Sequence, residues 1–435
     1  MSRYPKTLFA ESLTGHSGTL ELMDDLGAAL ALHRDRMRLL GGGNPAHIPA
    51  VQAVWRQAMA DLLADGPRFD SVLADYDQPA GNPRFREAVA GYLNRECGWK
   101  LTREHIGVTS GGQTAFFLLL NRFAGTLPDG SRRRVLLPVV PEYIGYSDQG
   151  VAGSLFQSCR PRIDLLGDRE FKYHVDFEKV CGEFPDPVGA ITVSRPTNPS
   201  SNVLTDDEIR RLAALAKQKG VPFILDNAYG LPFPGVIFED VTPIWTEDMI
   251  LTLSLSKIGL PGTRTGIVVA HPDIIREVAA MNAIVGLANN NLGQALTLGM
   301  IESGEIGRLS REVVRPFYAG RARFAISLMH ENLPADLPWR LHRSEGAFFL
   351  WLWLPGLPVS ARELYQRLKA RDVIVVPGEH FFYGLDAGSD DWPHRRECLR
   401  ISFGQPETIL RQGIEILGQE VRRAYSEKVR VSSDR

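Results

Sequence analysis

The chain has 435 residues, of which 44% are hydrophobic and 23% are charged, and its formal net charge is −2 at pH 7. These values are typical of a folded globular protein, and the length exceeds what one hydrophobic core supports, so we expect two domains. The near-neutral charge gives no electrostatic reason to expect nucleic acid or an anionic membrane as a partner.

The cysteines and the most apolar segments bear on the cellular compartment. The four cysteines lie far apart, with no histidine at metal-ligand spacing, so we expect reduced thiols and no metal site. Residues 1–18 lack the apolar core of a signal peptide. The stretch GAFFLWLWL at 346–354 is too short to cross a bilayer and predicts a buried strand. We therefore expect a cytoplasmic protein.

The first segment with a chemical signature is VTSGGQTAFFLLL at 108–120. It predicts a short strand, a glycine turn and then a helix, so free backbone N–H groups converge at Gly111, Gly112 and Gln113. Such a helix N-terminus suits an anion. The alternative is a tight turn that binds nothing.

The middle of the chain alternates apolar runs with amphipathic helices. AITVS at 190–194 predicts a strand, a helix follows from the capping box of Thr205 and Glu208 to Gly220, and VPFILDNAYG predicts the next strand. This alternation predicts an α/β fold with a mostly parallel sheet covered by helices on both faces. Ligands of such sheets bind outside the carboxyl ends of the strands.

Two polar residues lie near those strand ends. Asp226 ends an apolar strand, where a carboxylate needs a cationic partner such as a protonated pyridine nitrogen, although a capping role is common. Asn198, in the proline-bounded loop RPTNPS, could donate to a phenolic oxygen or form an Asx turn. Tyr229 could bind the same ligand or could only pack in the core.

The stretch SLSKIGLPGTR at 254–264 surrounds one lysine, Lys257, with two serines, Ser254 and Ser256, and with Arg264. An imine-forming lysine must lose its proton near neutral pH, which burial and a neighbouring cation favour. The planar fork of an arginine also suits a phosphate. The alternative is a surface lysine in a Gly-Pro loop.

Segments that break the alternation lie at the two ends of the chain. We expect a large domain over 50–315, and a smaller α+β domain in which 1–49 packs with 316–435.

In chain order these segments specify a phosphate-binding turn, an anion for a ring nitrogen and an imine-forming lysine. The sequence resembles the class I/II pyridoxal-phosphate-dependent aminotransferases of fold type I over nearly its whole length. The matching motifs are SGGQTA, PEYIGY, RPTNP, DNAYG, SLSKIGLPGTRTG, GAFFLWL and CLRISF. The segments LGGGNPA, VPEYIGY, DNAYGLPFPG and WPH are most similar to the branch of this family that acts on valine and pyruvate.

The resemblance implies a role for each matching residue. Lys257 would be the Schiff-base lysine, Asp226 would pair with the pyridine nitrogen, Asn198 and Tyr229 would bind the phenolic oxygen, and Tyr143 would stack on the ring. The implied phosphate ligands are Gly111, Gly112, Gln113, Ser254, Ser256 and Arg264.

The resemblance also implies how the substrate and a second subunit are bound. Arg400 in CLRISF would bind the substrate α-carboxylate, with Asn198 and the loop around Gly43 and Asn44 closing on it. Tyr76 would reach the phosphate in the site of a partner subunit, which implies a homodimer. Ser201 departs from the family, which usually has glycine there, so the backbone of this loop is expected to differ.

The implied reaction is transamination between L-valine and pyruvate, which gives 3-methyl-2-oxobutanoate and L-alanine. Alternatives on the same cofactor are a different amino donor or a lyase reaction. Two further classes are disfavoured. A DNA-binding regulator would need a basic module before LGGGNP, and a dinucleotide oxidoreductase would need GGGNP between a strand and a helix.

Overall fold

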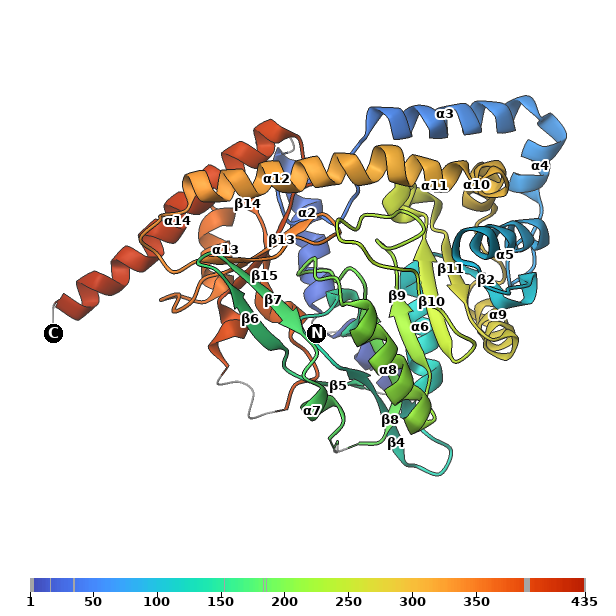
Figure 1. The fold of residues 1–435 in the computed structure, drawn as a ribbon, viewed down its shortest axis with the longest axis horizontal. Coiled ribbons are helices and arrows are strands. Elements are labelled where there is room, and N and C mark those ends of the chain that lie inside the picture. The colour runs from blue at the N-terminus through green and yellow to red at the C-terminus, as the bar shows by residue number, and fades with distance from the viewer. Residues whose placement is uncertain are drawn as a thin grey trace.

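The computed structural model describes residues 4–15, 17–33, 36–151, 153–182, 184, 186–386 and 392–433. Two large β-sheets lie beside each other, each with helices packed on it, and a long helical run crosses from one to the other (Figure 1). None of the described helices is long and apolar enough to cross a membrane.

The larger sheet is mostly parallel. Its strands, in spatial order, are β2 (Ile106–Thr109), β11 (Gly266–Val269), β10 (Met249–Ser254), β9 (Phe223–Asp226), β8 (Val188–Ser194), β4 (Arg132–Leu137) and β3 (Gly125–Thr126), with β5 (Phe156–Ser158) also paired to β4. Strands β10, β9, β8, β4 and β5 run parallel, whereas β11 is antiparallel to both of its neighbours and β3 to β4. The expected α/β fold is confirmed.

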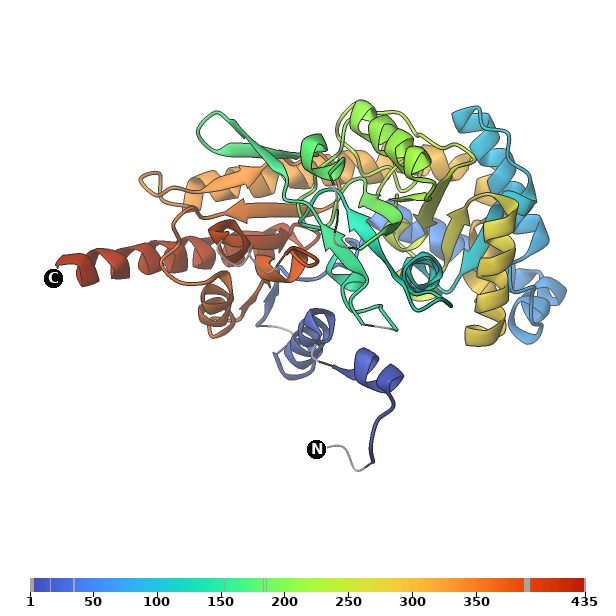
Figure 2. The same ribbon diagram turned by 90° about the horizontal axis from the view of Figure 1, so that it is seen from below.

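Helices cover both faces of this sheet, with α8 (Asp206–Lys219) on one face and α6 (Gly112–Phe123) on the other (Figure 2). The predicted ends of α8 are confirmed: Thr205 and Glu208 form the capping box, and Gly220 ends the helix in the left-handed conformation. The other helices of this region are α3 (Pro49–Ala64), α4 (Gly66–Ala74), α5 (Pro83–Cys97), α7 (Phe177–Val180), α9 (Pro272–Gly286), α10 (Asn291–Ser303) and α11 (Glu305–Leu309).

The second sheet contains the apolar segment that the sequence singles out. Its strands, in spatial order, are β15 (Val376–Pro377), β16 (Cys398–Ser402), β13 (Phe349–Trp353), β12 (Arg340–His342), β7 (Glu170–His174) and β6 (Arg162–Leu166). The predicted buried strand is therefore β13, at the centre of this sheet. Helices α12 (Arg315–Asn332), α13 (Ala361–Lys369) and α14 (Glu407–Ser433) belong to the same part of the chain.

Two pairings join segments that are distant in sequence. Strand β1 (Arg38–Leu39) pairs in parallel with β14 (Val373–Ile374), which joins an N-terminal segment to the C-terminal part of the chain. The β6–β7 hairpin comes from the middle of the chain, yet β7 pairs with β12 of the second sheet. The predicted division, with one domain over 50–315 and another formed by 1–49 and 316–435, assigns the β6–β7 hairpin to the large domain, whereas β7 pairs with the second sheet. The domain boundaries stay a prediction.

Candidate active site

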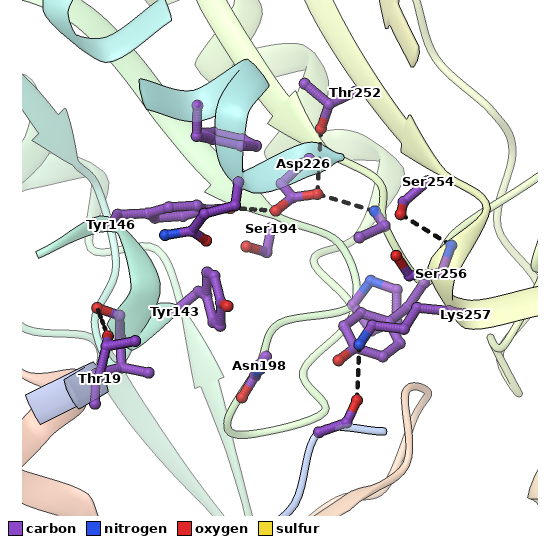
Figure 3. Close-up of a pocket in the computed structure, with 18 of the residues that line it drawn as sticks. Thr19, Tyr143, Tyr146, Ser194, Asn198, Asp226, Thr252, Ser254, Ser256 and Lys257 are labelled. Carbon is purple, nitrogen blue, oxygen red and sulfur yellow. Dashed lines mark hydrogen bonds between the residues drawn. The ribbon is translucent and has the colours of Figure 1, made fainter. Parts of the chain in front are cut away.

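A cavity of about 290 Å³ opens where strands β9 and β10 end, on the side that faces the second sheet. Figure 3 shows side chains from many segments converging on it. The residues that line it are Thr19, Met23, Gly43, Asn44, Gly112, Gln113, Phe116, Tyr143, Ile144, Tyr146, Ser194, Pro196, Asn198, Asp226, Ala228, Tyr229, Thr252, Leu253, Ser254, Ser256, Lys257, Arg264 and Arg400. This location follows the general rule for open α/β sheets.

The turn before α6 is shaped for an anion. Gly111 has φ of +91°, a conformation that glycine tolerates, and a Cβ built on it would lie 2.3 Å from the Nη2 atom of Arg264. Only glycine therefore allows the guanidinium to pack against this turn. The backbone N–H groups of Gly112 and Gln113 lie in the first turn of α6, beside that cation.

The serines at the end of β10 complete this part of the cavity. The hydroxyl of Ser254 accepts a hydrogen bond from the backbone N–H of Ser256 at 3.1 Å, which fixes the turn ahead of Lys257 (Figure 3). The side-chain amide of Gln113 donates to the carbonyl of Gly145 at 2.7 Å, so this side chain supports a neighbouring turn. The arrangement offers hydroxyls, backbone N–H groups and one guanidinium to a phosphate.

Asp226 ends β9 and is partly buried, in the lining of the cavity. Its Oδ1 atom accepts hydrogen bonds from the backbone N–H of Ala228 at 2.9 Å and from the Thr252 hydroxyl at 3.2 Å, and its Oδ2 atom accepts one from the Tyr146 hydroxyl. Burial raises the pKa of Asp226, although the hydrogen bond from Tyr146 opposes the rise. A cation at this position would compensate the cost of the buried charge.

Lys257 lies just after β10, in the 3-10 turn η3 (Ser256–Ile258), and its Nζ atom donates to the carbonyl of Gly43 at 2.8 Å. Burial, the largest cause, lowers the pKa of Lys257 to about 8, and the cations Arg400 and Arg264 act in the same direction. Asp226 opposes them. A lysine in this setting has a substantial neutral fraction near neutral pH and can act as a nucleophile or a base.

Arg400 enters from β16 of the second sheet and is 2% exposed. Its Nη1 atom donates to Oδ1 of Asn198 at 2.7 Å, its Nη2 atom donates to the carbonyl of Gly41 at 2.6 Å, and Nε is buried without a partner. Burial lowers the pKa of Arg400 to about 10. Among the described residues no acidic side chain pairs with this guanidinium, so the site fits an anionic ligand.

The loop from β8 to α8 shows why Ser201 can replace a glycine. Ser201 has φ of +60°, in the left-handed region that favours glycine. Its hydroxyl donates to the carbonyl of Phe349 at 2.6 Å, which ties the strained loop to β13. Ser201 therefore adopts a backbone conformation that glycine adopts readily, contrary to the expected difference, and its hydroxyl adds a hydrogen bond to the second sheet.

The structure brings most of the predicted residues to one cavity. Those that line it are Gly43, Asn44, Gly112, Gln113, Tyr143, Asn198, Asp226, Tyr229, Ser254, Ser256, Lys257, Arg264 and Arg400. Gly111 packs behind Arg264. Tyr76 lies elsewhere: it is 83% exposed and lines a surface groove with residues of α4, α5 and α10. Its contact with a partner subunit stays a prediction.

Sequence reasoning missed several lining residues. Tyr146 is the second tyrosine of PEYIGY, three residues after Tyr143, and that spacing across one 3-10 turn is a signal that could have found it. Thr19 and Met23 come from the N-terminal helix α2 (Gly18–His33). Nothing local in the sequence places them there, because α2 is held through contacts such as Glu21 with Arg362.

Comparisons with known proteins place the chain in a family. Residues 40–417 match the family model described as aminotransferase class I and II. The valine–pyruvate aminotransferase of Escherichia coli K12 is 44% identical over 421 residues, which are 97% of this chain and 99% of that protein.

Solved structures of aminotransferases also match this chain. The crystal structure of valine–pyruvate aminotransferase from Salmonella typhimurium LT2 matches with a TM-score of 0.85 and 43% identity, covering 94% of this chain and 100% of that one. Aspartate aminotransferase from Thermus thermophilus matches with a TM-score of 0.75 at 20% identity, covering 96% of this chain and 100% of that one, and this likeness concerns the fold alone.

Proposed function

The chain belongs to the class I and II aminotransferases, which use pyridoxal 5′-phosphate, and on this premise we propose that it transfers the amino group between L-valine and pyruvate. The products are 3-methyl-2-oxobutanoate and L-alanine. The structural observation that carries the proposal is the pairing of Lys257 with a buried Arg400 across one cavity. The first is a candidate nucleophile, and the second is a guanidinium that lacks an acidic partner among the described residues.

The residues of the cavity offer suitable partners for the phosphate and the ring nitrogen of the cofactor, and Asn198 and Tyr229, which also line it, would bind the phenolic oxygen. The first turn of α6, Ser254, Ser256 and Arg264 would hold the phosphate, and the tight packing of Gly111 on Arg264 supports this. Asp226 would hold the ring nitrogen in its protonated form, and Tyr143 would lie against the ring. The bound cofactor supplies an electron sink for the pair of electrons left when the substrate Cα loses its proton.

Lys257 would attach the cofactor and then move the substrate proton. Its lowered pKa, about 8, leaves a fraction of the amine neutral at physiological pH, as both tasks require. The carbonyl of Gly43, which now accepts a hydrogen bond from Nζ at 2.8 Å, would hold the displaced amine near the reacting carbon. The loop around Gly43 and Asn44 thus contributes to proton transfer as well as to closing the site.

Arg400 would bind the substrate α-carboxylate. Its planar fork can donate two parallel hydrogen bonds to a carboxylate, and Asn198 orients it through the 2.7 Å hydrogen bond. A 2-oxo acid presents the same carboxylate as an amino acid, so one arginine serves both half-reactions.

The remaining lining favours a small apolar substrate side chain. Among the lining residues that the structure describes, the cations are Lys257, Arg264 and Arg400, and each already has a proposed role. Among the described lining residues of this one chain, no further cation is present for a second carboxylate, as an aspartate substrate would need. Met23, Ile144 and the methyl group of Thr19 offer apolar surface instead.

We also infer that the protein is a cytoplasmic homodimer. The exposed phenol of Tyr76 supports this inference, because a tyrosine that is 83% exposed in one chain can still serve the site of another. Sedimentation of the cofactor-loaded protein tests the dimer. A monomer at micromolar concentration would contradict it.

A panel of L-amino acids with pyruvate tests the reaction. We expect alanine and 3-methyl-2-oxobutanoate to form in equal amounts from valine and pyruvate, and aspartate to be a poor donor. Oxo acid formed without consumption of pyruvate would identify a lyase. Faster turnover with aspartate than with valine would show that the substrate is misassigned.

A further inference from the structure

Arg400 lies in the middle of three paired strands of the second sheet. Its partners in register are Trp351 on β13 and Val376 on β15. Side chains alternate between the two faces of a sheet, so Phe349, two residues before Trp351, lies on the same face as Arg400. Phe349 and Trp351 are both buried. The strand pairing therefore places the side chain of Arg400 on an aromatic part of the sheet.

Two phenylalanine rings contact the guanidinium of Arg400. Its Cζ atom is 4.4 Å from the centroid of the Phe349 ring and 5.3 Å from that of the Phe381 ring. Both distances are within the range of about 6 Å over which an aromatic face attracts a cation. Phe381 ends the turn η6 (Gly378–Phe381) and is buried. Neither ring belongs to the lining of the cavity, so each acts on the site through Arg400.

The position of Phe381 is fixed from two sides. Its ring meets that of Trp351 edge to face, with centroids 5.7 Å apart, and Nε1 of Trp351 donates to the hydroxyl of Tyr173 at 2.8 Å. The backbone carbonyl of Phe381 accepts a hydrogen bond from the backbone N–H of Glu142 at 3.0 Å. The ring is thus held both by the sheet and by the segment that precedes Tyr143.

The rings contact a charge that has no acidic partner among the described residues. The side-chain oxygen of Asn198 and the carbonyl of Gly41 accept hydrogen bonds from the guanidinium, and both groups are neutral. A carboxylate in the place of a ring would neutralise the cation and compete with an incoming anion. An aromatic face attracts the cation without neutralising it. The guanidinium therefore keeps its charge for a carboxylate that binds at its edge.

We propose that Phe381, together with Phe349, is a positioning residue that holds the guanidinium of Arg400 in the orientation that binds the substrate carboxylate. This inference rests on the proposed role of Arg400. Without the ring of Phe381 the guanidinium can turn into the vacated space, so ordering that the wild type has before binding must occur during binding. The affinity for every substrate that presents this carboxylate then falls. The residues proposed to hold the cofactor are unaltered.

Phe381 is the better of the two positions to test. The ring of Phe349 also packs on that of Tyr229, a lining residue, with centroids 6.0 Å apart, so a change there disturbs the cavity directly. Phe382 provides a matched control for Phe381. It is adjacent, buried and also packed on Trp351, with ring centroids 6.0 Å apart, and no contact of its ring with Arg400 is found among the described residues.

The experiment compares Phe381→Leu with Phe382→Leu. The cofactor-loaded proteins are titrated with 3-methylbutanoate, a carboxylate without an amino group. We expect Phe381→Leu to weaken its binding by about three- to ten-fold, the scale of ordering one long side chain. The KM of valine and of pyruvate should rise by a similar factor, whereas kcat and the affinity for the cofactor should stay within about two-fold of the wild type.

Phe382→Leu should leave all of these quantities within about two-fold, although both variants lose stability because both remove a buried ring. Phe381→Met, which also lacks the ring but fills an irregular space well, is measured alongside with the same expectation as Phe381→Leu. Equal weakening by the changes at 381 and 382, or no weakening by either folded variant at 381, would overturn the proposal.

A double variant separates orientation of the guanidinium from general packing. A lysine ammonium has no plane to orient, so in an Arg400→Lys background Phe381→Leu should change the affinity for 3-methylbutanoate by less than about two-fold. A full effect in that background would also overturn the proposal. If Arg400→Lys by itself binds 3-methylbutanoate as tightly as the wild type does, the proposed role of Arg400 fails instead, so the two failures are distinguishable.

Discussion

The two sheets present their charged groups to the cavity in different ways. Asp226, on the larger sheet, is surrounded by donors: a backbone N–H, a threonine hydroxyl and a tyrosine hydroxyl. Arg400, on the second sheet, has a buried Nε without a partner and two acceptors that carry no charge. The first group is orientated in advance for a ligand that stays bound. The second keeps an open site for a carboxylate that enters and leaves.

Under the proposed function, this contrast would place the cofactor on the larger sheet and the substrate carboxylate on the second sheet. Variants that impair binding of the cofactor alone, or of the substrate carboxylate alone, test this assignment. The largest effect is expected where the two sides meet, at Lys257.

Lys257→Met should reduce turnover by at least about 10⁴-fold, the upper end of what a general acid–base contributes. The thioether keeps the length of the side chain but can neither attach the cofactor nor carry a proton. Reduction of the wild-type holoenzyme with borohydride followed by peptide mapping provides the companion test. Cofactor found on any other lysine would show that the nucleophile is misassigned.

Asp226→Asn should slow turnover by about 10²–10³-fold, the usual scale for losing one electrostatic stabiliser. The amide keeps the shape but cannot hold the ring nitrogen charged, so the cofactor should still bind at saturating concentration. Single-turnover kinetics with valine measure the step. Turnover near the wild-type rate would remove Asp226 from the account of the electron sink.

Arg400→Lys should lower kcat/KM by about ten- to a hundred-fold for valine and for pyruvate alike, which corresponds to about 1.5–3 kcal/mol for a hydrogen bond to a charged group. A lysine retains the charge and loses the fork that binds both carboxylate oxygens. Steady-state kinetics with each substrate measure the loss. An effect confined to one substrate would contradict a shared carboxylate site.

The free energy of unfolding of the cofactor-free protein should depend on Lys257. The pKa of Lys257 is about 8 in the folded state and 10.5 in the unfolded state. Below pH 8 the charged ammonium is less well solvated in the folded state, which lowers the free energy of unfolding. This destabilisation decreases as the pH rises from 8 to 10.5. Lys257→Met should therefore be more stable than the wild type by about 1–3 kcal/mol at pH 7. Urea unfolding at pH 7 and pH 10 measures the gain, which should shrink at the higher pH.

The smallest effect is expected at Ser201. Ser201→Ala keeps a strained left-handed backbone and loses the hydrogen bond to Phe349, so it should destabilise the protein by about 1–2 kcal/mol. Ser201→Gly loses the same bond but relieves the strain, so its stability should stay within about 1 kcal/mol of the wild type. Equal losses in thermal unfolding would show that the backbone conformation carries no cost.

Much of the larger sheet could be predicted from local patterns. Thr205, Glu208 and Gly220 mark the ends of α8, because caps depend on neighbouring residues alone. Asp226 was predictable as a strand-end residue. The β6–β7 hairpin was not, because the register of β7 is set by β12, and no local pattern reports a partner so far away in sequence.

The residues of the site also fall into two groups, those that local sequence predicts and those whose contacts depend on distant segments. Lys257 and Arg264 lie in one short motif, so their proximity could be predicted. Glu142 and Ser194 meet only because the segment after β4 folds across the end of β8, and neither residue type signals the contact. Family resemblance alone pointed to Arg400, since its approach to Asn198 depends on how the two sheets pack.

The most direct test of the division between the sheets measures two affinities in two variants. Wild type, Asp226→Asn and Arg400→Lys are titrated with pyridoxal 5′-phosphate, and the loaded proteins are titrated with 3-methylbutanoate, which has the carboxylate and branched chain but no amino group. We predict that Asp226→Asn weakens binding of the cofactor and keeps the affinity for 3-methylbutanoate, whereas Arg400→Lys keeps the affinity for the cofactor and weakens binding of 3-methylbutanoate by about ten- to a hundred-fold. If both variants weaken both ligands to the same degree, the assignment of one ligand to each sheet is contradicted.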